Sequence, residues 1–107
     1  MLVLPSKGQI MDKNFTVGRP NPALSQKVAF TGTAGTTNAL PANCNVVRVM
    51  ATSDCFIEIT TAGTAAVADT GMYLVANSPE YLECDGGAKV SAIQVSTGGT
   101  LYVTPMV

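Results

Sequence analysis

The 107-residue sequence predicts an all-β protein, a single domain built as a β-sandwich or a barrel. Short runs rich in Val, Ile, Thr and Tyr are separated by Gly and Pro along the whole chain, as in sandwiches and barrels. Charged residues make up only 12% and apolar residues 47%, a mixture that argues against a helical bundle. The length suits one modest hydrophobic core.

Seven runs after the first 25 residues are strand candidates. They cover residues 26–31, 46–52, 55–60, 72–75, 79–84, 89–95 and 101–104. Residues 32–45 form a long loop, and a further strand near Phe15 would bring the total to eight. Val90 and Ile93 cannot share one face of a regular strand, so we expect a bulge there or a strand covered on both faces.

Three short loops between neighbouring runs predict three β-hairpins. The loops cover residues 52–54, 85–87 and 97–99. This register pairs four charged residues, Arg48 with Glu58 and Glu83 with Lys89. We interpret both pairs as structural ion pairs, each stabilising the sheet by about 0.2–1 kcal/mol. Those charges then serve strand pairing and not catalysis.

Residues 1–25 predict an extended N-terminal arm that precedes a sandwich domain of residues 26–107. Prolines interrupt any continuous strand in the arm, yet the segment is too apolar for a solvated tail. Such a segment lies either on its own domain or on a neighbouring subunit. We expect its large apolar side chains to form a protein interface: Leu2, Leu4, Ile10, Met11 and Phe15.

The charges are unevenly divided along the chain. Residues 1–27 hold four basic residues and one acidic residue, whereas residues 28–107 hold two basic and six acidic residues. The basic residues do not cluster, and only Phe15 among the first 27 offers a ring for base stacking. The expected partner is therefore an acidic protein surface and not nucleic acid.

The sequence offers little for catalysis or metal binding. It has no histidine, no glycine-rich phosphate loop and no zinc-type cysteine spacing. Cys44, Cys55 and Cys84 are interpreted as reduced thiols that fill space on strands. Asp69 and Glu80 are the one carboxylate pair considered for acid–base chemistry or calcium binding. We expect no enzyme activity, cofactor, metal or small-molecule ligand.

No apolar run reaches the roughly 18 residues that a membrane span needs. The first four residues are apolar but too few for the core of a signal peptide. We therefore expect a protein that is made and kept in a cytoplasm, unless it leaves as part of a larger assembly.

Three stretches of the chain from Val46 onward carry a family resemblance: VVRVMATSDCFIEI, TAAVADTGMYLVANSPEYL and KVSAIQVSTGGTLYVTPMV. In this order they resemble small structural proteins of tailed-phage virions. The resemblance implies a jelly-roll or Greek-key sandwich that acts as a capsid decoration or cement protein. Such a protein binds and stabilises the shell of the major capsid protein as a dimer or trimer. It is made in the host bacterial cytoplasm and resides on the capsid surface of the virion, and the family has no catalytic residues to carry over.

An alternative function is a carbohydrate-binding or host-adhesion sandwich on a head fibre. Exposed Tyr73 and Tyr81, beside Asn77 and Glu80, would form the sugar platform. The absence of Trp and an aromatic content of 6% argue against it. The competing interpretation of both tyrosines is packing at a sheet edge or in the core.

Overall fold

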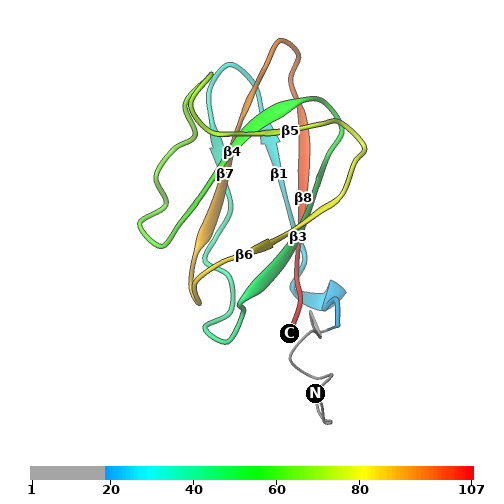
Figure 1. The fold of residues 1–107 in the computed structure, drawn as a ribbon, viewed down its shortest axis with the longest axis vertical. Helices are drawn as coiled ribbons and strands as arrows, with labels where there is room; N and C mark the ends of the chain where they lie inside the picture. The colour runs from blue at the N-terminus through cyan, green and yellow to red at the C-terminus, as the bar shows by residue number, and fades with distance from the viewer. Residues whose placement is uncertain (1–18) are drawn as a thin grey trace, which may run out of the picture.

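A computed structural model of the protein describes residues 19–107 (Figure 1). This part of the chain contains one short 3-10 helix and eight β-strands. They are η3 (Pro22–Leu24), β1 (Gln26–Phe30), β2 (Gly35–Thr36), β3 (Val46–Ala51), β4 (Cys55–Thr60), β5 (Met72–Leu74), β6 (Glu80–Glu83), β7 (Lys89–Gln94) and β8 (Gly99–Pro105).

The strands form two four-stranded antiparallel sheets packed as a sandwich, with the orders β1-β8-β3-β6 and β2-β7-β4-β5. Four of the pairings, β1 with β8, β2 with β7, β3 with β6 and β4 with β5, are those of one long hairpin. Rolling this hairpin up brings β3 against β8 and β4 against β7. This is the jelly-roll arrangement. The predicted all-β sandwich is confirmed.

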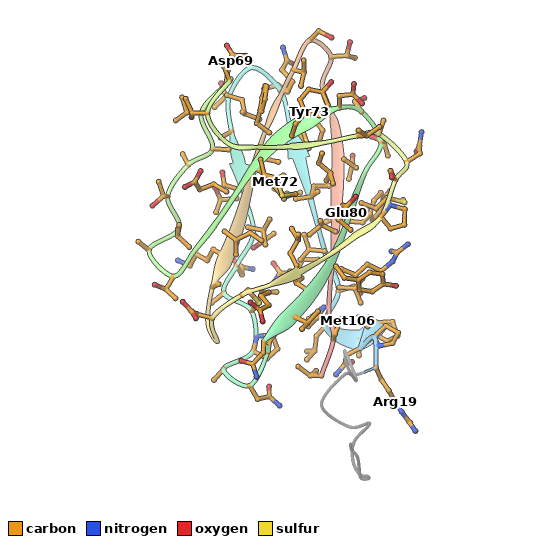
Figure 2. The ribbon with its side chains drawn as sticks, in the orientation of Figure 1. Arg19, Asp69, Met72, Tyr73, Glu80 and Met106 are labelled. Atoms are coloured by element: carbon orange, nitrogen blue, oxygen red, sulfur yellow. The ribbon has the colours of Figure 1, made fainter. Side chains whose placement is uncertain are left out.

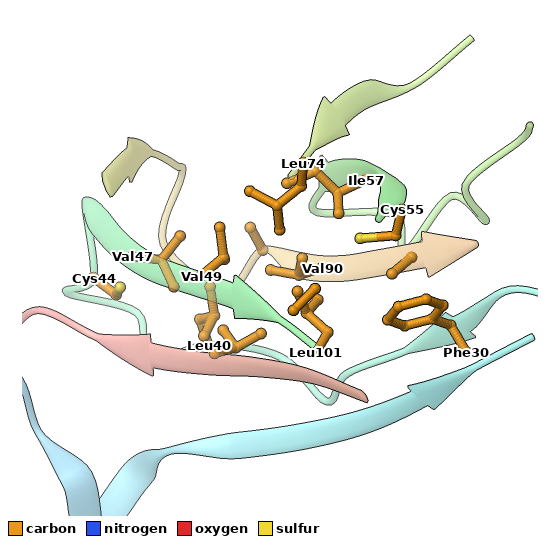
Figure 3. Packing of buried hydrophobic residues seen from close by; sticks show 14 residues of the cluster. Phe30, Leu40, Cys44, Val47, Val49, Cys55, Ile57, Leu74, Val90 and Leu101 are labelled. Carbon is orange, nitrogen blue, oxygen red and sulfur yellow. The ribbon is translucent and has the colours of Figure 1, made fainter. Parts of the chain in front are cut away.

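The core lies between the two sheets and follows the two-residue period of the strands. Val47, Val49 and Ala51 of β3 are fully buried, as are Leu101 and Val103 of β8. Figure 3 shows that these side chains meet those of the second sheet in one apolar layer. The first sheet adds Phe30 of β1, and the second sheet and the loops contribute Leu40, Cys44, Cys55, Ile57, Leu74, Ala88, Val90 and Ala92. Strand alternation thus decides which residues are inside.

The predicted pairing of Arg48 with Glu58 is wrong. β3 and β4 belong to different sheets, so the loop between them crosses the sandwich and closes no hairpin. Arg48 lies opposite Tyr81 on β6 and Thr104 on β8. Glu58 lies opposite Ser91 on β7.

The other two predicted hairpins are wrong for the same reason. Glu83 lies opposite Val46 in the first sheet, whereas Lys89 lies opposite Thr60 in the second. The turn after β7 likewise leads to β8 in the other sheet. None of the three short loops therefore sets a cross-strand ion pair.

The sequence analysis missed strand β2. It lies inside the segment predicted as a loop, where its two residues pair with Ser91 and Ala92 at a sheet edge.

The structure decides between the two solutions expected for strand β7. Val90 and Ala92 face the core, and the register of β7 with β4 has no bulge. Ser91 faces outward but is fully buried, and its hydroxyl oxygen accepts a hydrogen bond from the Ala66 amide at 2.9 Å. β7 is thus covered on both faces, one of the two expected solutions.

The described end of the predicted arm packs on the body of the same chain. Pro20 forms an isolated bridge with Met106, and the Asn21 amide donates to the Pro105 carbonyl at 2.9 Å. A 3-10 turn follows directly, so residues 19–25 are not simply extended. The predicted strand near Phe15 and the five predicted interface residues, Leu2, Leu4, Ile10, Met11 and Phe15, lie outside the described residues.

Candidate protein-interaction face

The outer face of the β1-β8-β3-β6 sheet carries the strongest candidate site. Because Val47 and Val49 point into the core, the alternating Arg48 and Met50 point outward. Two rows of outward side chains cross the strands in register: Lys27, Tyr102 and Met50, then Thr104, Arg48 and Tyr81. We name Lys27, Arg48, Met50, Tyr81 and Tyr102 the tyrosine face.

The composition of the tyrosine face is that of an interaction surface. Tyr81 is 53% exposed and Tyr102 is 41% exposed, while Arg48 and Met50 are half-buried. Tyr, Arg and Met are enriched in protein interfaces: Tyr offers a large rigid contact area, Arg a planar donor group and Met an adaptable apolar side chain. The composition of the tyrosine face therefore resembles that of a protein-binding surface more than that of an ordinary solvent-exposed surface.

The tyrosine face is also the basic part of an acidic body. Residues 19–107 contain four basic residues, and Lys27 and Arg48 are two of them. The same range contains six acidic residues, of which Glu83 lies at the end of the face, opposite Val46. Electrostatic complementarity favours a partner surface with excess negative charge.

The segment that leads into the sandwich meets this sheet at the end of the tyrosine face. The hydroxyls of Ser25 and Thr104 are 3.1 Å apart, next to the bridge between Pro20 and Met106. Figure 2 places Arg19 and Met106 at the same end of the molecule. Residues 19–25 therefore pack beside the end of the tyrosine face.

A second aromatic cluster lies on the outer face of the other sheet. Phe56 and Tyr73 contact edge to face, with ring centroids 5.3 Å apart. The Tyr73 hydroxyl donates to Asp54 Oδ2 at 2.6 Å, and the Ala76 amide donates to Asp54 Oδ1 at 2.8 Å. These bonds lower the pKa of Asp54, and the bond with Asp54 raises the pKa of Tyr73. Asp54 thus fixes this cluster to the loop that crosses between the sheets.

The predicted sugar platform is not assembled. Tyr73 and Tyr81 are both exposed, but they project from the outer faces of different sheets. The paired carboxylates considered for acid–base chemistry are also separated. Figure 2 shows Asp69 and Glu80 far apart, one in the connection before β5 and the other on β6.

A cavity of about 490 Å³ opens at the end of the sandwich where β4 and β6 finish. It is lined by Asn45, Ile59, Thr60, Thr61, Glu83, Cys84, Asp85 and Ala88. Within residues 19–107, no group of three or more His, Cys, Asp or Glu side chains lies close enough together to hold a metal ion.

Two of the three thiols have raised pKa values. Burial raises the pKa of Cys55 to about 11, and burial together with the neighbouring Cys44 raises the pKa of Cys84 to about 12. Thiols with such pKa values are poor nucleophiles at neutral pH.

Sequence reasoning missed most of the tyrosine face. Tyr102 lies between the buried Leu101 and Val103, so strand alternation alone marks it as outward-facing. The sequence does not reveal which residues lie beside Tyr102. Tyr81 and Tyr102 come to lie on either side of β3 only because β6 and β8, both distant from β3 in sequence, pair with it.

Across the described part of the chain, no helix has the length and apolar character to cross a membrane. Comparison with protein-family models, curated proteins and solved structures finds no match.

Proposed function

We propose that this protein is a non-catalytic capsid decoration, or cement, protein that binds and stabilises the shell of a phage major capsid protein. The observation that carries the proposal is that the tyrosine face adjoins the point where the N-terminal segment enters the sandwich. The partner surface is acidic and faces Lys27 and Arg48. The apolar side chains of residues 1–17 form the second half of the contact.

Two contacts on one molecule suit a protein that clamps a repetitive shell. Once the tyrosine face has docked, binding of the adjoining segment to a neighbouring subunit becomes an intramolecular event. Neither contact then has to be strong alone. Specific interfaces bury about 800 Å² per partner, an area that a sheet face and an adjoining segment can supply together.

The protein acts as a dimer or trimer in this proposal, because several copies of each contact raise avidity on a symmetric shell. The mass of the free protein in solution tests this part. A monomer that binds shells fully would remove oligomerisation from the proposal and leave the two-contact clamp.

Co-sedimentation with shells of the major capsid protein tests the function. The full-length chain is expected to pellet with expanded shells, whereas a chain lacking residues 1–17 is expected to stay folded and remain in the supernatant. Circular dichroism confirms that the shortened chain is folded. Failure of the full-length chain to bind would reject the capsid function, and normal binding of the shortened chain would reject the role of residues 1–17.

The carbohydrate alternative is less well supported, because Tyr73 and Tyr81 lie on different faces. The isolated protein is expected to be silent on a glycan array. Binding of one glycan class that is lost on Tyr81→Ser would favour the adhesion function instead.

A further inference from the structure

Two of the three cysteines meet at the cavity end of the sandwich. The Sγ atoms of Cys44 and Cys84 are 3.9 Å apart, although the residues are 40 positions apart in sequence. Cys44 precedes β3 and Cys84 follows β6, and these two strands are antiparallel neighbours. The Cys84 amide donates to the Asn45 carbonyl at 2.9 Å, so the strand pairing continues to Cys84 and to Asn45, the residue that follows Cys44.

The two sulfur atoms already lie near the separation that a disulfide requires. In a disulfide the Sγ atoms are about 2.05 Å apart. The sulfurs therefore need to approach by about 2 Å, a movement within the reach of side-chain rotation. The Cys44 thiol now donates to the Val46 carbonyl at 3.2 Å, and the Cys84 thiol to the Cys44 carbonyl at 3.6 Å.

The two thiols differ in access. Cys44 is completely buried, whereas Cys84 is half-buried and lines the cavity of about 490 Å³. A small reagent can reach Cys84 from the cavity but has no direct route to Cys44. Cys55 is fully buried on β4, in the other sheet.

We infer that Cys44 and Cys84 form a redox-active dithiol that a small-molecule disulfide converts to an intramolecular disulfide. The Cys84 thiolate attacks one sulfur of the reagent, whose S–S bond breaks and releases one thiolate. The Cys44 thiolate then attacks Cys84 Sγ and displaces the second thiolate. The two protons lost by the cysteines go to the released thiolates, so the protein loses two electrons and the reagent becomes two thiols.

The bond would join the connection before β3 to the turn after β6, on one side of the cavity. A reducing compartment keeps the pair as thiols, and an oxidising one favours the disulfide. The raised pKa of Cys84, about 12, makes its thiolate scarce at neutral pH. We therefore expect oxidation about tenfold faster for each pH unit between about pH 7 and 9. This inference does not depend on the capsid function.

Oxidised glutathione added to the native full-length protein is the test. Free thiols counted after denaturation are expected to fall from three to one, with no glutathione retained, and peptide mapping is expected to link Cys44 to Cys84. The matched control Cys55→Ala is expected to form the same bond. Three thiols remaining after incubation at about pH 9, or a disulfide that includes Cys55, would overturn the inference.

The variant Cys44→Ser tests the order of the two steps. It removes the resolving thiol, so glutathione is expected to accumulate on Cys84 as a mixed disulfide, seen as an added mass. Cys84→Ser is expected to gain no glutathione on the native protein, because Cys44 is buried. Rapid modification of Cys44 in folded Cys84→Ser would overturn the assigned order.

Discussion

The two outer faces of the sandwich carry similar side chains but differ in what covers them. On the β2-β7-β4-β5 sheet, the connection between β4 and β5 folds over the strands and buries Ser91 completely. Tyr73 on the same face is bonded to Asp54. On the β1-β8-β3-β6 sheet, Tyr81 and Tyr102 are exposed side by side with Arg48 and Met50.

The difference between the two faces is that segments of the same chain cover one of them and leave the other open. Whether a face is covered in this way indicates a binding surface better than its residue types do. Both faces contain exposed tyrosine and a basic residue, so the presence of these residue types alone does not separate them. One face is completed by hydrogen bonds within the chain. The other presents its largest side chains outward, as the free half of an interface does.

The largest expected effect comes from removing both tyrosines of the tyrosine face. Tyr81→Ser with Tyr102→Ser is expected to weaken shell binding about 100-fold, because two interface tyrosines contribute roughly 1–2 kcal/mol each and 1.4 kcal/mol is tenfold. The matched control is Val75→Thr with Val95→Thr, two exposed residues near the other aromatic cluster. A binding titration against shells measures both. Equal weakening by the two double variants would erase the distinction between the faces.

The next largest effect is expected on the free energy of unfolding, from a substitution on the covered face of the β2-β7-β4-β5 sheet. Ser91→Ala removes the acceptor of the Ala66 amide and leaves that buried N–H unpaired. We expect the free energy of unfolding to fall by about 1–3 kcal/mol. Thr104→Ala on the uncovered sheet removes only an exposed contact with Ser25 and is expected to cost less than about 0.5 kcal/mol. Chemical denaturation compares them, and equal losses would contradict the assigned coverage.

Most strands of this protein were predictable from the sequence, but the pairing between them was not. Seven strands were predicted within one or two residues at most of their ends, because apolar alternation is a local signal. The hairpins were not, because Ala51 and Cys55 both face the core whether the loop between them turns within a sheet or crosses to the other sheet. The two-residue period is satisfied in either case. β2 was missed because Gly35 and Thr36 give no alternating apolar pattern.

The candidate site was harder to predict than the fold. Exposure of Tyr81 follows from alternation within its own strand, but its row with Arg48 and Thr104 depends on two pairings with strands distant in sequence. Coverage of Ser91 depends in the same way on where a long connection folds back. Local patterns therefore predicted which residues point outward, and only the tertiary structure shows which of them remain uncovered.

A smaller effect is expected from reversing one charge on each sheet. Lys27→Glu and Lys89→Glu change the net charge equally, but only Lys27 belongs to the tyrosine face. Lys27→Glu is expected to slow association with shells several-fold at low salt and much less at high salt, because charge steering is screened. Lys89→Glu is expected to change the rate less than twofold. Association kinetics at two ionic strengths measure the difference, and identical salt dependence would show that only net charge matters.

The smallest effect concerns the tyrosine that is bonded within its own chain. The Tyr73 hydroxyl and the Ala76 amide lower the pKa of Asp54 below its ordinary value of 3.8. A lowered carboxyl pKa stabilises the folded state above the unfolded pKa, and this contribution is lost as pH falls through the folded pKa. Tyr73→Phe is therefore expected to unfold at a slightly lower temperature than the unmodified protein at pH 7, with the difference closing near pH 2. The effect is small because Asp54 is solvent-accessible.

Tyr102→Phe is the matched control for this experiment, because Tyr102 lies on the other sheet from Asp54. Its difference from the unmodified protein is expected to be independent of pH between about 2 and 7. Thermal unfolding of both variants across this range measures the contrast. If Tyr102→Phe showed the same pH-dependent difference as Tyr73→Phe, the hydroxyls would not differ in their partners. The expected result instead separates a tyrosine that stabilises its own fold from one left available to another molecule.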